Sequence, residues 1–158
     1  MLQQFYPTPS HNFRYELNKD MHFAAAHFIP DPSAGVCQRM HGHTYFVNVT
    51  IAGDTLDDVG FLIDFKQLKQ LVHGTYDHSV MNDHREFQDE QYPTTERVAF
   101  QIWHNIQTVL NTFAHKPRCI QVLVRETPTS YVRYVPKASD FKGKYLYSKY
   151  LDQRFKEK

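Results

Sequence analysis

Alternating apolar and polar residues mark two β-strands in the first third of the chain. The first stretch covers residues 12–29 and the second covers residues 43–52. In both, apolar side chains recur at every second position over much of the stretch, which is the pattern of a strand with one buried face. Residues 30–35 contain two prolines and a glycine, which disfavour regular structure. The pattern therefore predicts two strands joined by a loop.

The middle of the chain changes to the spacing of amphipathic helices. Asp64 is a good N-cap residue, and apolar side chains follow it at helical spacing, so a helix is predicted from residue 65 to about residue 73. Thr94 or Thr95 can cap a second helix, whose apolar face extends over four turns. That face consists of Ala99, Ile102, Trp103, Ile106, Leu110 and Phe113.

Two further strands are predicted after the second helix. Residues 119–125 alternate between apolar and polar side chains, and residues 131–135 return as a hairpin partner after a turn. The order strand, strand, helix, helix, strand, strand predicts an α+β fold, ββααββ, with a four-stranded antiparallel sheet and two helices on one face. Its open edges invite pairing in an oligomer. Residues 1–136 are predicted to form a single domain, and residues 137–158 a C-terminal tail of unknown role.

Composition narrows the classes of function. The 158 residues include 18 Lys and Arg against 17 Asp and Glu, so the formal net charge is only +1. This balance argues against a general nucleic-acid-binding protein. Residues 1–20 lack the features of a secretory signal, and no apolar run approaches the length of a membrane span. With two cysteines and no disulfide framework, a cytoplasmic protein without a membrane partner is expected.

The tail from residue 137 combines lysine and arginine with five aromatic residues. Such a mixture could bind RNA by stacking and charge. The alternative is an appendage that packs on a neighbouring subunit, or a disordered end. The low net charge and the lack of a nucleic-acid motif favour this alternative.

Three histidines form a candidate metal site. His41 and His43 lie two residues apart at the start of the second strand, so both imidazoles leave the same face. His27 ends the first strand and could meet this pair across a two-stranded ladder. Three imidazoles with an open fourth position are what a catalytic zinc site requires. The alternative is three unrelated polar residues in a chain that has ten histidines.

Other residues have side chains suited to acid–base work or to binding. Cys37 lies four residues before His41, where a nearby cation would favour the thiolate, although it could also be an inert loop thiol. Asp77 can hold an imidazole tautomer for His78, although such a pair can simply cap a turn. Glu126 stands beside a turn, where its carboxylate can accept two hydrogen bonds from an amidine-like ring edge or remain an exposed turn residue.

Taken together, six short motifs resemble the 6-pyruvoyltetrahydropterin synthase family, and specifically its 6-carboxytetrahydropterin synthase branch in the queuosine pathway. The resemblance covers about residues 13–135, and the motifs occur in the family's order. They are Phe23-Ala24-Ala25-Ala26-His27, Cys37-Gln38-Arg39-Met40-His41-Gly42-His43, Gly60-Phe61-Leu62-Ile63-Asp64-Phe65, Tyr76-Asp77-His78, Pro93-Thr94-Thr95-Glu96 and Arg125-Glu126-Thr127.

The resemblance implies a tunnelling fold, in which subunits join their sheets into a barrel, commonly a homohexamer of two trimers. It implies that Zn2+ is the cofactor and that a small pterin triphosphate is the substrate. The residues that match the family's zinc ligands are His27, His41 and His43. Those that match its catalytic thiol and the acid–base partners of that thiol are Cys37, Asp77 and His78. Those that match its substrate-binding residues are Glu126, which anchors the pterin ring, and Thr94, Thr95 and Glu96, which a neighbouring subunit supplies.

The activity implied by the resemblance is a zinc-dependent lyase reaction in queuosine and 7-deazapurine biosynthesis. It converts 7,8-dihydroneopterin triphosphate to 6-carboxy-5,6,7,8-tetrahydropterin, with release of acetaldehyde and triphosphate. The three-residue spacing between Cys37 and His41 resembles the carboxy branch. The alternatives are 6-pyruvoyltetrahydropterin synthase activity and a zinc-stabilised pterin-binding module without turnover. Tyr76 departs from the family's more usual leucine, and the tail beyond residue 137 lies outside the resemblance.

Overall fold

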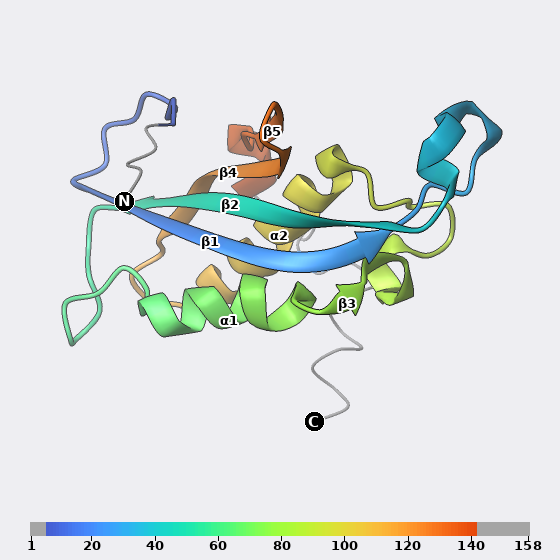
Figure 1. Ribbon diagram of the computed structural model, residues 1–158. Helices are drawn as coiled ribbons and strands as arrows, with labels where there is room; N and C mark the ends of the chain where they lie inside the picture. The colour runs from blue at the N-terminus through green and yellow to red at the C-terminus, as the bar shows by residue number, and fades with distance from the viewer. Residues whose placement is uncertain (1–5, 142–158) are drawn as a thin grey trace.

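The computed structural model describes residues 6–141 of the chain. Residues 142–158, which include most of the predicted tail, lie outside the described residues. The strands lie in one sheet in the order β3 (Ser79–Val80), β1 (Tyr15–His27), β2 (His41–Gly53), β4 (Arg118–Thr127) and β5 (Ser130–Tyr134). The helices α1 (Phe65–Tyr76) and α2 (Thr95–Leu110) cover one face of this sheet (Figure 1). The predicted α+β arrangement of antiparallel strands and two helices is therefore confirmed.

Strands β1 (Tyr15–His27) and β2 (His41–Gly53) form a long antiparallel ladder. Their register pairs Tyr15 with Gly53 at one end and His27 with His41 at the other. Strand β2 begins at His41, two residues before the predicted start, because this pairing continues to the end of β1. The ladder thus brings the histidine at the end of β1 directly opposite the histidines that begin β2.

The other strands lie on both sides of this ladder. Strand β4 (Arg118–Thr127) pairs antiparallel with β2, and β5 (Ser130–Tyr134) pairs antiparallel with β4. A two-residue strand, β3 (Ser79–Val80), adds a parallel edge beside β1. The sequence did not predict β3, because two residues are too few to show an alternating pattern.

Side-chain caps begin both helices where the sequence predicts them. Helix α1 (Phe65–Tyr76) begins after Asp64, whose Oδ1 accepts a hydrogen bond from the Lys66 amide at 2.7 Å. It continues beyond the predicted end at about residue 73 and buries the side chain of Tyr76 completely. Helix α2 (Thr95–Leu110) begins after Thr94, whose Oγ1 accepts from the Arg97 amide at 3.3 Å.

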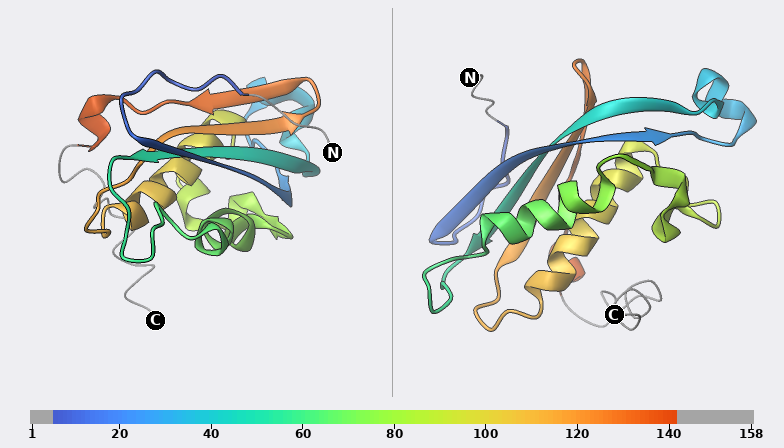
Figure 2. Two further views of the ribbon diagram at one scale, coloured as in Figure 1. Left: turned by 90° about the vertical axis from the view of Figure 1, so that its left-hand side faces the viewer. Right: turned by 60° about the horizontal axis from the view of Figure 1, so that its bottom comes forward.

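The apolar core lies between the sheet and the two helices. Both views in Figure 2 show the two helices on the same side of the sheet. Among residues 6–141, no helix covers the other face of the sheet (Figure 2). Instead, the arm before β1 runs along it, and Arg133 on β5 donates a hydrogen bond to the Pro7 carbonyl at 3.1 Å. None of the helices in residues 6–141 is long and apolar enough to cross a membrane.

Candidate active site

The structure brings His27, His41 and His43 together on the helix-covered side of the sheet. One ring nitrogen from each lies within 4.8 Å of the others. The ring centroids of His27 and His41 are 4.6 Å apart, and those of His41 and His43 are 4.9 Å apart. The predicted clustering of these three residues is therefore confirmed, and it results from the β1–β2 register.

Two backbone carbonyls determine which nitrogen of each ring faces the centre. Nδ1 of His27 lies 2.9 Å from the Pro93 oxygen, and Nδ1 of His41 lies 2.7 Å from the Arg39 oxygen. Because a carbonyl oxygen can only accept, each Nδ1 carries the proton and each Nε2 of the neutral ring presents a lone pair. This is the orientation of metal-ligating histidines, whose second nitrogen is bonded to an outer partner.

The spacing of the Nε2 atoms fits a bound cation. Those of His27 and His41 are 3.0 Å apart, so two lone pairs face each other with no proton between them. Nε2 of His43 is buried and has no hydrogen-bond partner among the described residues. A divalent metal at this point would satisfy all three atoms. Burial also lowers the pKa of His27, because desolvation disfavours the imidazolium and keeps the ring in its ligating form.

Glu126 on β4 extends the histidine cluster. Its Oε1 lies 3.3 Å from Nε2 of His27 and 3.4 Å from Nε2 of His43. The strand alternation places Glu126 on the same face as the buried Val122 and Val124, and therefore toward the helices. A carboxylate next to the histidines can accept hydrogen bonds from a ligand or contribute negative charge near a metal.

A cavity of about 420 Å3 adjoins this carboxylate. Its walls are the first turn of α2, with Thr95 and Glu96, and the β4–β5 hairpin, with Glu126 and Ser130. Both glutamates belong to the same chain. The expectation that a neighbouring subunit supplies Thr95 and Glu96 to the Glu126 pocket is therefore wrong, because α2 packs its N-terminus against the hairpin of its own sheet.

Thr94 has a different position from the two residues that follow it. Its hydroxyl accepts the Arg97 amide as the α2 N-cap, and it is not among the residues that line the 420 Å3 cavity. The predicted cap is thus confirmed. In this chain, Thr94 shapes the cavity by fixing the start of the helix that carries Thr95 and Glu96.

Tyr45 is a residue of this site that the sequence reasoning missed. It follows His41 and His43 on the same face of β2, and its ring lies edge-on to His43 at 5.6 Å. The side chain is fully buried, and its hydroxyl has no hydrogen-bond partner among the described residues. Burial and the charge of Glu126 raise the pKa of Tyr45, so it stays a neutral phenol. The period of two that identified His41 and His43 also includes Tyr45.

The Asp77–His78 pair forms at the end of α1. Oδ1 of Asp77 accepts the Ala24 amide at 2.9 Å, and Oδ2 lies 2.6 Å from Nδ1 of His78. Nε2 of His73 lies 3.4 Å from the same Oδ2. The Ala24 amide, helped by His78, holds the pKa of Asp77 below its ordinary value, so this carboxylate remains ionised. The predicted carboxylate–imidazole contact is present.

This pair lies apart from the three histidines. His78 borders a shallow depression with Ala24, Ala26, Gly42 and Thr44, which face away from the helices, and His43 of the cluster also contributes to the lining of this depression. The side chain of His78 is 85% exposed. Among residues 6–141, no recorded hydrogen bond or ion pair joins it to the histidine cluster.

Cys37 lies outside both groups. It belongs to the irregular 3-10 segment Pro32–Gln38, where its carbonyl accepts the Ile29 amide at 2.8 Å. Its side chain is exposed, and the described residues offer its thiol no hydrogen bond. One chain by itself therefore does not assemble Cys37 and His78 into a single constellation.

Comparison with known proteins agrees with this geometry. Residues 16–137 match the model of the family described as 6-pyruvoyl tetrahydropterin synthase. The chain belongs to this family. The predicted family resemblance is confirmed, and the three histidines, Glu126 and the Asp77–His78 pair all fall within the matched residues.

Individual relatives support the 6-pyruvoyl tetrahydropterin synthase family assignment. The chain is 59% identical over 146 residues to a Bacillus subtilis protein named 6-carboxy-5,6,7,8-tetrahydropterin synthase, with 90% of this chain and 100% of that protein covered. A Synechocystis protein of the same name is 34% identical, with 73% and 89% covered. The solved Caenorhabditis elegans 6-pyruvoyl tetrahydropterin synthase has a TM-score of 0.63 at 23% identity, with 78% of this chain and 96% of that chain covered. This structural likeness confirms the tunnelling fold.

Proposed function

We propose that this protein is a zinc-dependent 6-carboxy-5,6,7,8-tetrahydropterin synthase that acts on 7,8-dihydroneopterin triphosphate and serves queuosine biosynthesis. The observation that carries the proposal is the convergence of three imidazole nitrogens beside Glu126, at the wall of a 420 Å3 cavity. The 59% identity to the Bacillus subtilis protein of that name, which covers that protein completely, supports the same activity.

His27, His41 and His43 would hold the zinc ion through their Nε2 atoms. When bound, the metal supplies Lewis-acid chemistry that makes hydroxyl and neighbouring carbon protons of a substrate easier to remove. Tyr45 closes the buried side of the site beneath these rings and, as a neutral phenol, adds no charge there.

The cavity beside the histidines is suited to an amidine-like ring edge such as that of a pterin. Glu96 and Glu126 both line it, and an ionised carboxylate accepts two parallel hydrogen bonds from neighbouring N–H groups. In this role Glu126 holds the ring, while the substrate side chain extends toward the histidines. Oε1 of Glu126 lies only 3.3 Å from Nε2 of His27, so a pterin ring bound to Glu126 would lie next to the metal position.

Proton transfer requires Cys37 and the Asp77–His78 pair. As a thiolate, Cys37 takes a proton from the substrate side chain, and three residues tether it to His41. Asp77 holds Nδ1–H of His78, so Nε2 can accept or return a proton. Because His78 borders the open face of its own sheet, it reaches the substrate of a neighbouring subunit. The active form is therefore an oligomer, with a hexamer as the assembly expected from the family resemblance.

The product distinguishes this activity from that of a 6-pyruvoyl synthase. Zinc-loaded protein is incubated with 7,8-dihydroneopterin triphosphate, acetaldehyde is followed with a coupled dehydrogenase, and the pterin is identified by mass spectrometry. The expected products are 6-carboxytetrahydropterin and acetaldehyde. Accumulation of a pyruvoyl pterin without acetaldehyde would show that the carboxy assignment is wrong, and binding without any turnover would make the protein a pterin-binding module.

A further inference from the structure

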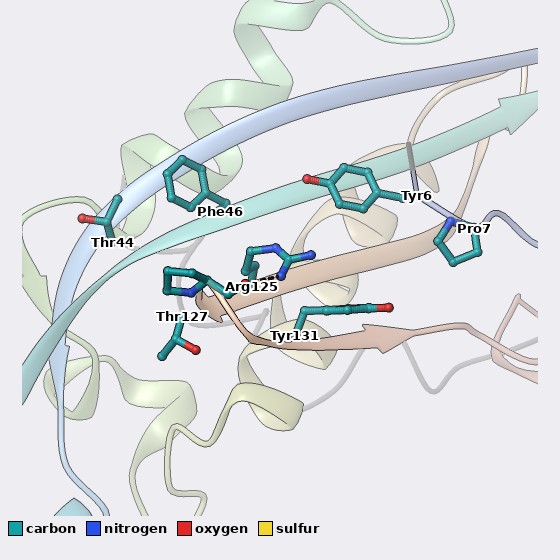
Figure 3. Close-up of a pocket in the computed structure, with 8 residues that line it drawn as sticks. Tyr6, Pro7, Thr44, Phe46, Arg125, Thr127 and Tyr131 are labelled. Carbon is teal, nitrogen blue, oxygen red and sulfur yellow. Dashed lines mark hydrogen bonds between the residues drawn. The ribbon is translucent and has the colours of Figure 1, made fainter. Parts of the chain in front are cut away.

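A second cavity lies on the face of the sheet opposite α1 and α2. Its volume is about 520 Å3, within the range of small-molecule sites. Thr44 and Phe46 line it from β2, at the positions that alternate with His43 and Tyr45, so it opens on the side opposite the histidine cluster. Figure 3 shows Tyr6 of the N-terminal arm, Phe46, Arg125 and Tyr131 around this cavity.

Arg125 is the one charged residue among the eight that line the cavity. Its guanidinium carbon lies 4.7 Å from the centre of the Tyr131 ring, and Nη1 donates to the Pro128 carbonyl at 3.1 Å. Nε is buried and has no hydrogen-bond partner among the described residues. None of the carboxylates in residues 6–141 lies within ion-pair distance of this guanidinium. Asp20 on β1 instead accepts a hydrogen bond from Asn48 at 2.9 Å. The Tyr6 side chain also interacts with this guanidinium, but Tyr6 carries no charge to balance it. A partly buried cation whose Nε donor is unused favours an anionic acceptor.

Aromatic rings form much of the remaining wall. Phe46 is 48% exposed and Tyr131 is 50% exposed, although both border a concave surface. Exposed ring faces beside a guanidinium favour a flat, conjugated ligand, because such a ligand can stack on the rings while a carboxylate meets the planar donors of the arginine. A small inorganic anion would use the charge but leave the ring faces exposed.

We propose that this cavity binds a planar heteroaromatic carboxylate, with its carboxylate on Arg125 and its ring against Phe46 and Tyr131. The choice of ligand rests on the proposed function, whose product is a pterin that carries a carboxylate. The cavity is thus a second product-binding site, on the face of the sheet opposite the active site.

The test measures binding of pterin-6-carboxylate, a fluorescent probe, to the zinc-loaded full chain by equilibrium dialysis. Two molecules are expected per chain, one at each cavity. Arg125→Gln should retain one, with affinity at the second cavity weakened about ten- to a hundredfold, the loss typical of a charge-assisted hydrogen bond. Arg14→Gln is the matched control, since Arg14 is exposed and lies outside the cavity lining. Unsubstituted pterin, which lacks the carboxylate, should not bind at the Arg125 cavity.

Two further variants keep the outcome decisive. Phe46→Ser removes a ring from the cavity wall but keeps the charge of Arg125, so it should also weaken binding at the Arg125 cavity. This variant tests the inference even if Arg125→Gln fails to fold. Glu126→Gln should remove binding at the active-site cavity alone. If Glu126→Gln changes nothing while Arg125→Gln removes one ligand, the proposed function fails and this inference stands. The inference would be overturned if Arg125→Gln and Phe46→Ser both still bound two molecules of pterin-6-carboxylate per chain. It would also be overturned if unsubstituted pterin bound equally well at the Arg125 cavity.

Discussion

At the residue scale, backbone carbonyls give the histidine cluster its directionality. The Pro93 and Arg39 carbonyls each bind the outer nitrogen of one imidazole, so the inner nitrogens cannot turn away without losing a hydrogen bond. Rings fixed in this way lose little further freedom when a metal binds, which favours a high affinity. The three rings are nevertheless separate ligands, and the loss of any one leaves an incomplete set.

His41→Ala should therefore lose stoichiometric zinc and turnover together, because only two imidazoles then remain. Loss of an outer-shell partner alone costs about ten- to a hundredfold in metal affinity or activity, so loss of a ligand should cost at least as much. Metal content is measured by atomic emission after dialysis. His11→Ala is the control, since His11 lies on the N-terminal arm beside Glu16. A His41→Ala protein that keeps one zinc per chain would rule out the assignment.

Two buried tyrosines offer a matched pair of hydroxyl deletions. The Tyr45 hydroxyl has no hydrogen-bond partner among the described residues, whereas the Tyr76 hydroxyl donates to Glu86 at 2.7 Å and accepts from Asn105 at 3.1 Å. In metal-free protein, Tyr45→Phe should leave the free energy of unfolding unchanged or raise it by about 1 kcal/mol, because a desolvated group is removed. Tyr76→Phe should lower it by about 1–2 kcal/mol.

Urea unfolding of both variants measures the difference. The two substitutions remove the same atom from equally buried rings, so each is the control for the other. Equal destabilisation would show that the Tyr45 hydroxyl has a partner in solution.

At the element scale, two neighbouring threonines at the N-terminus of α2 have different roles, one in helix stability and the other in the cavity. Thr94 caps the helix, and Thr95 lines the cavity beside Glu126. Thr94→Ala should lower the free energy of unfolding by about 1 kcal/mol, as expected for a lost N-cap, and change KM little. Thr95→Ala should instead raise KM with a smaller loss of stability. The prediction fails if Thr94→Ala raises KM as much as Thr95→Ala does.

The end of α1 is tied to the edge of the sheet through Asp77. Its pKa is lowered by the Ala24 amide and by His78, so the ionised form stabilises the fold. For a lowered pKa, this stability is present above the unfolded value of about 3.9 and is lost as the pH falls through the folded value. The unfolding free energy of metal-free protein should therefore fall less steeply below about pH 4 in Asp77→Asn than in the wild type.

Urea titrations at a series of pH values follow this slope. Asp58→Asn, at an exposed loop position, controls for the simple loss of one negative charge. Parallel profiles for Asp77→Asn and the wild type would show that the link between α1 and β1 does not depend on the charge of Asp77.

At the scale of the whole molecule, the two faces of the sheet divide the predicted machinery. The histidines and Glu126 lie on the helix side, while His78 borders the open side. Mixed oligomers of inactive Cys37→Ala and inactive His78→Ala chains should therefore regain activity, because some interfaces combine an intact Cys37 with an intact His78. Random mixing of equal amounts would restore about a quarter of the sites in a symmetric oligomer.

The control for this experiment is a mixture of Glu96→Ala chains with Glu126→Gln chains. Both residues line one cavity of one chain, so no mixed interface rebuilds it and activity should stay lost. Recovery in this second mixture, or none in the first, would contradict the division of the site between subunits.

The sequence by itself determined the features that depend on neighbouring residues. Alternation with a period of two predicted the long strands and placed His41 and His43 on one face, and cap residues such as Asp64 predicted where both helices begin. These features are local, because backbone geometry fixes the direction of each side chain relative to the next few residues.

Only the tertiary structure decided which distant groups meet. The register of β1 with β2 put His27 opposite His41, and the packing of α2 against the β4–β5 hairpin placed Glu96 in the cavity of its own chain. The short edge strand β3, which directly follows His78, pairs with β1 and so places His78 beside the open face of the sheet. Pairing register and packing depend on contacts between residues far apart in the chain, which a local pattern of residue types does not specify.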